Sequence, residues 1–200
     1  MDAARAAGWA PQALADAFLE GGARFLQLRA KSLSGAAFLD LASEVAARTA
    51  AAGATLVVND RADIARLVGA AGVHVGQTDL PPAAARSLVG PDGIVGLSTH
   101  SMAQIDSALA ASGLSYLAIG PVYSTMTKAG ASEPVGLEGV RGAAARAQAA
   151  GIPLVAIGGV TRENASGVIE AGATCVAVIG DLLAGGNPAA RVRALLAATS

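Results

Sequence analysis

The stretch TLVVNDRADIARLVGAAGVHVGQ, residues 55–77, contains one complete structural unit of this protein. It begins with an apolar, β-branched run that ends in Asn59 and Asp60, continues through a segment with helical character, and closes with a second apolar run, GVHVGQ. Apolar runs of this length without clean alternation are typical of strands that are covered on both faces in a parallel sheet. Glycine is the usual residue just past the end of a helix. We therefore interpret residues 55–77 as strand, helix and strand.

The same pattern repeats in both directions along the chain. Short apolar runs stand at residues 25–30, 55–60, 72–77, 93–98, 116–122, 153–159 and 175–180. Ala-rich segments with helical character separate these runs, and most of them end in glycine. A further helical segment, PQALADAFLEGG, precedes the first run. The sequence therefore predicts a βα repeat with seven strands.

This order favours an α/β fold of the TIM-barrel type, a (β/α)₈ barrel that lacks its first strand in this sequence. Such a barrel needs eight parallel strands to close, and the chain opens with a helical segment where that strand would come before it. The strands at 25–30 and 175–180 would then be unpaired edges. A doubly wound sheet tolerates seven strands, but no G-x-G-x-x-G motif follows the first run.

Composition restricts the classes of function. The 200 residues are 53% hydrophobic, which fits a single domain, residues 1–200, with a sizeable core. The formal net charge is −1 and only 14% of residues are charged, so we expect no nucleic-acid partner and no membrane partner. Small-molecule anions would have to be bound locally. The sequence leaves the oligomeric state open, and a homo-oligomer is among the outcomes.

The cysteine content and the N-terminal composition favour a cytoplasmic protein. The single cysteine, Cys175, lies in an apolar run that we interpret as a buried strand, and one cysteine cannot form an internal disulfide. The first residues include early acidic side chains and no apolar core of a signal peptide.

Polar residues gather at the carboxyl ends of the predicted strands, which is where the reactive groups of a (β/α) barrel lie. They include the cations Arg29, Lys31 and Lys128, the neutral donors Gln27 and Asn59, and the carboxylates Asp60 and Asp79. Mg²⁺ is usually held by one or two carboxylates together with substrate phosphates and water. These residues together could hold a metal-bound polyphosphate. The alternative for each aspartate is a helix N-cap, with Asp60 opening the segment after it and Asp79 the segment LPPAAARSL.

Three other polar residues receive no catalytic role. His74 stands in the middle of a strand, so a hydrogen-bonded core histidine is favoured over a catalytic one. Arg61 and Asp63 have the character of solvated residues in the first turn of a helix.

A second anion site is predicted near the C-terminus. AIGGVTREN places two glycines before a helix, and VAVIGDLL places another after the last strand. Backbone N–H groups in such turns bind phosphate, and the loops after the last two strands form the recurrent phosphate site of these barrels.

Six motifs resemble the thiamine phosphate synthase family in its order and spacing. They are QLRAK, VNDRADIA, GVHVGQTDL, GLSTH, GPVYSTMTK and IPLVAIGGVTREN, between about Phe25 and Leu183. The resemblance implies an enzyme that joins hydroxymethylpyrimidine diphosphate to hydroxyethylthiazole phosphate and releases pyrophosphate, in thiamine biosynthesis. Mg²⁺ is the cofactor that it implies.

The resemblance also implies roles for individual residues. Asp60 and Asp79 match the Mg²⁺ ligands. The diphosphate binders are matched by Gln27, Arg29, Lys31, Asn59 and Lys128. Ser98 matches a residue beside the reacting pyrimidine, and we take Ser98 and Lys128 as the catalytic pair. The thiazole-phosphate site is matched by Thr125, Thr127, Gly159, Ile179 and Gly180.

The chain departs from the family pattern in two places. The family's first strand, of the type LYLVTD, is absent, and VIGDLL stands where Ser-Ala commonly follows the last apolar pair, so Gly180 keeps a backbone donor without the hydroxyl. Two alternatives to the synthase follow. One is a thiazole tautomerase, an isomerase on the same barrel without Mg²⁺, and the other is an inactive truncated barrel that binds phosphorylated ligands.

Overall fold

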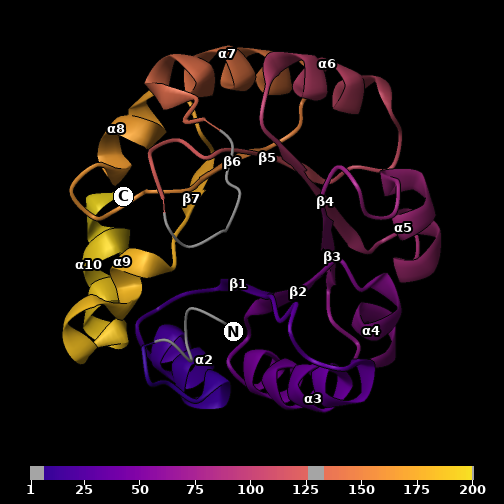
Figure 1. Ribbon diagram of the computed structural model, residues 1–200, viewed down its shortest axis with the longest axis vertical. Helices are drawn as coiled ribbons and strands as arrows, with labels where there is room; N and C mark the ends of the chain where they lie inside the picture. Colours follow the sequence, from indigo (N-terminus) through magenta and orange to yellow (C-terminus); the bar gives the residue numbers. More distant parts are fainter. Residues whose placement is uncertain (1–6, 126–132, 200) are drawn as a thin grey trace.

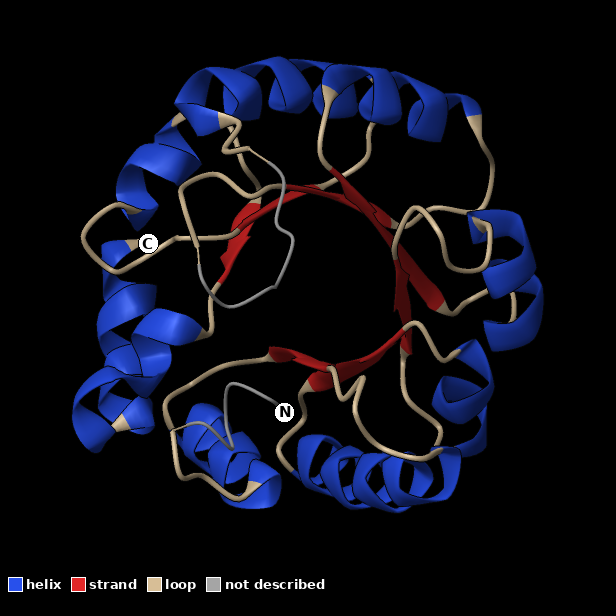
Figure 2. Ribbon diagram, in the orientation of Figure 1, coloured by secondary structure: helices blue, strands red, loops and turns tan. Residues whose placement is uncertain are grey.

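Seven parallel strands form one sheet whose strands follow each other in chain order. The computed structural model describes residues 7–125 and 133–199. The strands are β1 (Phe25–Leu28), β2 (Thr55–Asn59), β3 (Gly72–Val75), β4 (Ile94–Thr99), β5 (Tyr116–Ile119), β6 (Leu154–Ile157) and β7 (Cys175–Ala177). Each strand pairs in parallel with the next, and the sheet curves into an arc with the helices outside it (Figures 1 and 2). The consecutive order confirms the βα repeat and is inconsistent with a doubly wound sheet, in which the strand order reverses.

The helices form the outer layer. Their bounds are α2 (Pro11–Glu20), α3 (Gly35–Ala51), α4 (Ala62–Leu67), α5 (Pro82–Val89), α6 (Met102–Ala110), α7 (Gly136–Ala149), α8 (Ala165–Glu170), α9 (Gly180–Leu183), the short 3₁₀ turn η1 (Ala184–Gly186) and α10 (Pro188–Ala198). Several begin at side-chain caps, since Ser34, Ser101 and Asn187 each accept a hydrogen bond from a backbone N–H in the first turn that follows.

The main core lies between the sheet and this ring of helices. On β1, Leu26 and Leu28 are buried in that core, whereas the alternate residues Phe25 and Gln27 are exposed. The period of two along a strand places these alternate residues on the concave face. On β1 the concave face therefore carries Phe25 and Gln27, and the convex face carries Leu26 and Leu28.

The strands do not close into a ring, but the helices around them do. Among the described residues, β1 and β7 are the two edges of the sheet and do not pair with each other (Figure 1). Helices α2 and α10 meet across this gap, because α10 packs on α2 with Val192 and Leu195 buried. Gly21 permits the approach, since a Cβ at that position would lie 2.6 Å from the Cβ of Val192.

The open sheet exposes side chains that a closed barrel would cover. Phe25 is 50% exposed and Ile157 is 39% exposed, although both belong to strands. Cys175, at the start of β7, is exposed as well, so the prediction that it is buried was wrong. The physical reason is that Cys175 lies on an edge strand, where no neighbour covers it on one side. The run predicted at 175–180 is also shorter than expected, because Gly180 begins α9.

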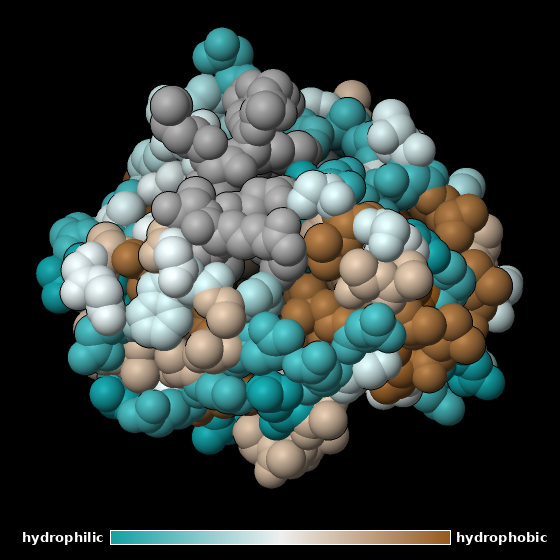
Figure 3. All heavy atoms as spheres, turned by 60° about the horizontal axis from the view of Figure 1, so that its bottom comes forward, coloured by the Kyte–Doolittle hydropathy of each residue, from teal (hydrophilic) through white to brown (hydrophobic). Residues whose placement is uncertain are grey.

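The outer surface beside α4 and α5 carries exposed apolar side chains. Leu67, Leu80 and Leu88 are exposed there. Apolar side chains gather on the right of Figure 3, the side on which α4 and α5 lie in Figure 1. None of the helices within the described ranges is long and apolar enough to cross a bilayer.

We predict that a strand added at the N-terminus stabilises the protein. About 10–15 residues encoding an apolar strand and its loop would pair with both edges and cover Phe25 and Ile157, a contribution of about 1–3 kcal/mol to the free energy of unfolding. For a chain of this size, each kcal/mol raises the melting temperature by roughly 2–4 °C. The control is an extension of equal length with two prolines in the strand, which cannot complete the hydrogen-bond ladder. Equal melting temperatures for the two extensions would contradict the prediction.

Candidate functional site

The end of β2 turns sharply and exposes a carboxylate at the rim of the sheet. Asp60 has φ = +63° and is the one residue other than glycine with positive φ among those described. Asp60 N–H still continues the ladder to the carbonyl of His74 at 2.8 Å, and Arg61 N–H then donates to the carbonyl of Asn59 at 2.8 Å. Aspartate tolerates this left-handed conformation better than most residues. Backbone strain of this kind gathers at functional sites.

Asp60 belongs to a small charged cluster at this rim. Lys31 Nζ lies 2.9 Å from Asp60 Oδ2. Burial raises the pKa of Asp60, the hydrogen bond with Lys31 opposes that rise, and the neighbouring Asp79 carboxylate adds to it. Asp79 is fixed in turn because its Oδ2 accepts a hydrogen bond of 2.8 Å from Gly76 N–H. Two carboxylates and a lysine that are far apart in the sequence are thus brought together.

The helix-cap alternatives for both aspartates were wrong. The N-cap of α4 is Arg61, and the N-cap of α5 is Pro81; neither makes a side-chain capping hydrogen bond. Asp63 and Arg61 form an exposed ion pair, as expected of solvated first-turn residues, and that hydrogen bond lowers the pKa of Asp63.

The donor set at this rim suits a magnesium ion that is shared with phosphate. In the part of the chain that the structure describes, no group of three or more His, Cys, Asp or Glu side chains could hold a metal alone. Asp60 and Asp79 provide two carboxylates, which is the number that Mg²⁺ commonly takes from a protein when substrate phosphates and water complete its octahedron. The two like charges also raise the pKa of Asp60, an effect that a cation between them would relieve.

A hydrogen-bonded set of side chains crosses the concave face. His74 on β3 is 6% exposed, with its Nδ1 2.7 Å from the Tyr116 hydroxyl and its Nε2 2.7 Å from Ser98 Oγ. Gln77 Nε2 donates to the Ser98 carbonyl at 2.7 Å. The prediction of a hydrogen-bonded core histidine is confirmed. Its partner is Ser98, for which the family resemblance implies a place beside the reacting pyrimidine.

Tyr116 was not among the predicted site residues. It stands opposite Gly96 in the β4–β5 register, and its ring occupies the space where a side chain at Gly96 would lie. Burial raises the pKa of Tyr116 far above its usual range, which keeps the phenol protonated. A tyrosine at the start of one strand and a glycine in the neighbouring strand were visible in the sequence, but only the register shows that they meet.

Two glycines after β6 bring a second loop close to the rim. Gly158 and Gly159 both have positive φ, and a Cβ at Gly159 would lie 2.7 Å from the Ser124 carbonyl oxygen. The loop after β5 is tied to the same place, because Tyr123 N–H donates to the Gly158 carbonyl at 3.0 Å. Thr125 is the last described residue of this loop before the gap at residues 126–132. Of the other residues predicted on it, Thr127 and Lys128 lie outside the described residues.

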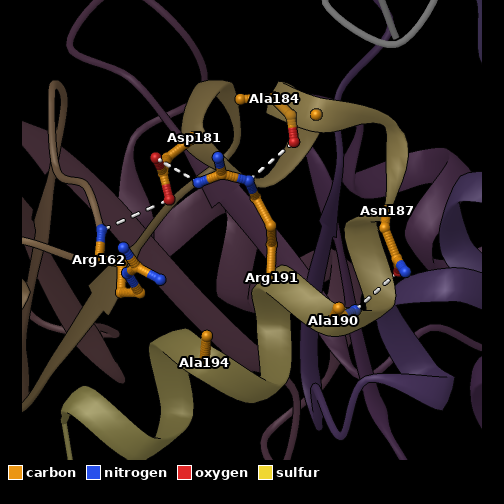
Figure 4. Close-up of a pocket in the computed structure, with 8 residues that line it drawn as sticks. Arg162, Asp181, Ala184, Asn187, Ala190, Arg191 and Ala194 are labelled. Atoms are coloured by element: carbon orange, nitrogen blue, oxygen red, sulfur yellow. Dashed lines mark hydrogen bonds and ion pairs between the residues drawn. The ribbon is translucent and has the colours of Figure 1, made fainter.

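Asp181, in α9, fixes the position of the loop that follows β7. Its carboxylate accepts hydrogen bonds from Arg191 at 3.0 Å and from the backbone N–H of Arg162 at 3.4 Å (Figure 4). Arg191 also donates to the Ala184 carbonyl. The hydrogen bond from Arg162 ties the loop after β6 to the start of α9, where the predicted Gly180 lies, and the ion pair ties α10 to the same helix.

The remaining predicted residues occupy the same strand ends. On β1 and the loop after it, Gln27 is exposed and Arg29 is half-buried; Asn59 is buried at the end of β2. Ile179 is half-buried before α9. The structure therefore brings Lys31, Asp60 and Asp79 into contact. Gly159 and Gly180, which were predicted to bind the thiazole phosphate, lie on the neighbouring loops after β6 and β7.

A family of known proteins matches most of this chain. The thiamine monophosphate synthase family matches residues 5–182. The chain belongs to the thiamine monophosphate synthase family. Its relatives include the thiamine-phosphate synthase of Chloroflexus aurantiacus, which is 40% identical over 199 residues, or 100% of this chain and 90% of that protein. The thiamine-phosphate synthase of Chlorobium luteolum is 45% identical over 181 residues, 90% of this chain and 82% of that protein.

A solved structure of the same family has the same architecture. The thiamine phosphate pyrophosphorylase from Pyrococcus furiosus superposes with a TM-score of 0.85 at 29% identity, over 95% of this chain and 89% of that one. The family resemblance read from the six motifs is thereby confirmed.

The close approach at Gly159 yields a prediction for this member of the thiamine monophosphate synthase family. Gly159→Ala should displace the loop after β5, because the added Cβ meets the Ser124 carbonyl, and should raise the KM for a phosphorylated substrate by an order of magnitude or more. Gly151→Ala is the matched control: its φ is +68°, but no atom lies within 4 Å of its Cβ position. Both variants share the strain of positive φ, about 1–2 kcal/mol. Equal KM values in the two variants would show that the contact is unimportant.

Proposed function

We propose that this protein is a thiamine-phosphate synthase, a transferase that couples hydroxymethylpyrimidine diphosphate with hydroxyethylthiazole phosphate and releases pyrophosphate. The observation that carries the proposal is the cluster of Lys31, Asp60 and Asp79 at the strand ends, within a chain of this family. Such a cluster fits a diphosphate that brings its own magnesium ion.

The main requirement of this reaction is that the protein binds and orients its two substrates. The bond from the pyrimidine methylene carbon to the diphosphate oxygen breaks, and its electron pair leaves with pyrophosphate. The thiazole nitrogen then forms a bond to the delocalised cation at that carbon. Mg²⁺, held by Asp60 and Asp79, would offset charge on the diphosphate. Lys31 adds a positive charge at the same place, and Arg29 and Lys128 are proposed to add two more.

The Ser98–His74 hydrogen bond does not indicate a hydrolase. In a serine hydrolase a carboxylate orients the histidine from Nδ1, whereas here the Tyr116 hydroxyl takes that place at 2.7 Å. The thiazole nitrogen is itself the nucleophile, so no covalent intermediate is needed. The role left for these side chains is orientation of the pyrimidine.

The two alternatives differ from the synthase in whether the strand ends must bind Mg²⁺ and a diphosphate. A thiazole tautomerase needs no Mg²⁺, and the paired Asp60 and Asp79 carboxylates favour a metal-dependent reaction over it. An inactive phosphate-binding barrel would not require the strained turn at Asp60 or the fixed Asp79. The proposal includes a cytoplasmic location, which the lone cysteine favours.

Magnesium dependence is the first test. Asp79→Asn keeps an oxygen that can accept the Gly76 N–H but removes the negative charge, so the fold should persist while the Mg²⁺ concentration required for pyrophosphate release rises by tenfold or more. The matched control is Asp63→Asn, which removes a nearby exposed carboxylate that is paired with Arg61. Full activity of the unmodified protein in EDTA would contradict magnesium dependence and the roles given to both Asp60 and Asp79.

The second test concerns Lys128, whose role in binding the diphosphate is inferred from the family motif alone. Lys128→Ala should remove a charge-assisted contact to the diphosphate that is worth roughly 1.5–3 kcal/mol. The KM for the pyrimidine diphosphate should rise roughly 10- to 100-fold, with little change in the KM for the thiazole phosphate. Arg141→Ala removes an exposed cation on α7 and serves as the control. Equal losses for the two substrates would show that Lys128 acts elsewhere.

A further inference from the structure

Three strands contribute to one line of hydrogen bonds across the concave face. The Tyr116 hydroxyl from β5 and Ser98 Oγ from β4 flank the imidazole of His74 from β3, each at 2.7 Å. The aromatic rings are also fixed by packing, since the Tyr116 ring stacks on His74 at 5.5 Å and meets Phe25 edge-on at 5.9 Å. These contacts leave the three polar groups little freedom to reorient.

The direction of the line depends on where the imidazole carries its proton. A neutral imidazole has one donor and one acceptor nitrogen, and a hydroxyl can play either part. If Nδ1 accepts from Tyr116, then Nε2–H donates to Ser98 Oγ, and the Ser98 proton remains available for a third group. If Nδ1–H donates to Tyr116 instead, Ser98 must give its proton to Nε2 and can only accept from a ligand.

The partners of Tyr116 fit the first direction. Burial raises the pKa of Tyr116, so its oxygen carries a proton to donate. The same hydroxyl is hydrogen-bonded to the Gln27 side chain, in the sense that lowers the pKa of Tyr116. An amide N–H of Gln27 can donate to the phenol oxygen, which leaves the Tyr116 proton for another acceptor. Tyr116 then gives its own proton to Nδ1 of His74.

The backbone of Ser98 is also fixed by a hydrogen bond. Gln77 Nε2 donates to the Ser98 carbonyl at 2.7 Å. The Ser98 hydroxyl itself is hydrogen-bonded to the imidazole of His74. Ser98 is half-buried at the carboxyl end of β4, among the strand ends where the substrates are proposed to bind.

We propose that Tyr116 and His74 are positioning residues, which hold Ser98 as a hydrogen-bond donor toward an acceptor atom of the bound pyrimidine diphosphate. The identity of this ligand rests on the proposed function, whereas the direction of the hydrogen bonds does not. The line runs from Gln27 through Tyr116 and His74 to Ser98, with each group donating to the next. It adds two residues, Tyr116 and His74, to those that the family motifs assign to this site.

The direction can be measured without any activity. The chain has two histidines, and nitrogen-15 NMR of their rings distinguishes a protonated from an unprotonated nitrogen. His74 should carry its proton on Nε2 at mildly alkaline pH. His100 is the internal reference for the opposite tautomer, because its Nδ1 lies against the Gly120 carbonyl oxygen, which can only accept. A His74→Asn variant assigns the signals. A proton on Nδ1 of His74, alone or together with one on Nε2, would overturn the proposal.

A double-mutant cycle tests whether the two residues act through Ser98. Tyr116→Phe keeps the ring contacts and removes the hydroxyl, and should lower kcat/KM by about two- to tenfold. In a Ser98→Ala background the same change should have almost no further effect, because the donor that it positions is gone. A loss of equal size in both backgrounds would mean that Tyr116 acts independently of Ser98, and the positioning role would be wrong.

Thr99→Val is the matched control for the cycle. Thr99 is the next residue of β4, 1% exposed, and its hydroxyl donates to the Ala118 carbonyl at 2.8 Å away from the line. This variant also loses a buried hydroxyl, but its effect on kcat/KM should be the same in the unmodified protein and in the Ser98→Ala background. Absence of thiamine phosphate formation by the unmodified protein would contradict the proposed function, whereas the wrong His74 tautomer would contradict this inference alone.

Discussion

The parallel alignment of the seven strands is the constraint on which the rest of this structure depends. Parallel pairing brings every carboxyl end to the same rim, so each loop that follows a strand contributes to one surface. Lys31, Asp60 and Asp79 come from three different loops and meet for this reason. An antiparallel arrangement of the same segments would place neighbouring strand ends on opposite rims and would separate this cluster.

The absence of a side chain at a few glycines then determines which groups can pack on the concave face and at the strand ends. Gly96 leaves the space that the ring of Tyr116 fills, and this ring in turn stacks on His74. Gly158 and Gly159 let the loop after β5 lie against the loop after β6. Small residues are therefore placed where two backbones, or a backbone and an aromatic ring, must approach closely, and the functional groups occupy the space that they leave.

The sheet is open between β1 and β7, which leaves apolar side chains exposed, and the packing of α2 on α10 partly offsets this loss of burial. Phe25 and Cys175 lie on the unpaired edge strands β1 and β7 and are exposed to water. The contact of α2 with α10 closes the outer layer across the same gap. The concave face is thus more accessible near β1 and β7 than elsewhere, and Gln27, the first group of the hydrogen-bonded line, lies on one of those edge strands.

The sequence by itself determined the strands, their parallel arrangement and the strand-end residues, because these depend on local patterns. Seven apolar runs separated by helical segments can pack in few other ways, and the aspartates at the ends of two runs could be recognised before any coordinates. The sequence did not determine the line from Tyr116 to Ser98, whose members are 42 and 24 residues from His74. Only the register and the inward direction of alternate side chains bring those three groups within hydrogen-bond distance. The exposure of Cys175 was likewise decided by the tertiary structure, because burial of an apolar strand requires a neighbour, and the edge of an open sheet has none on one side.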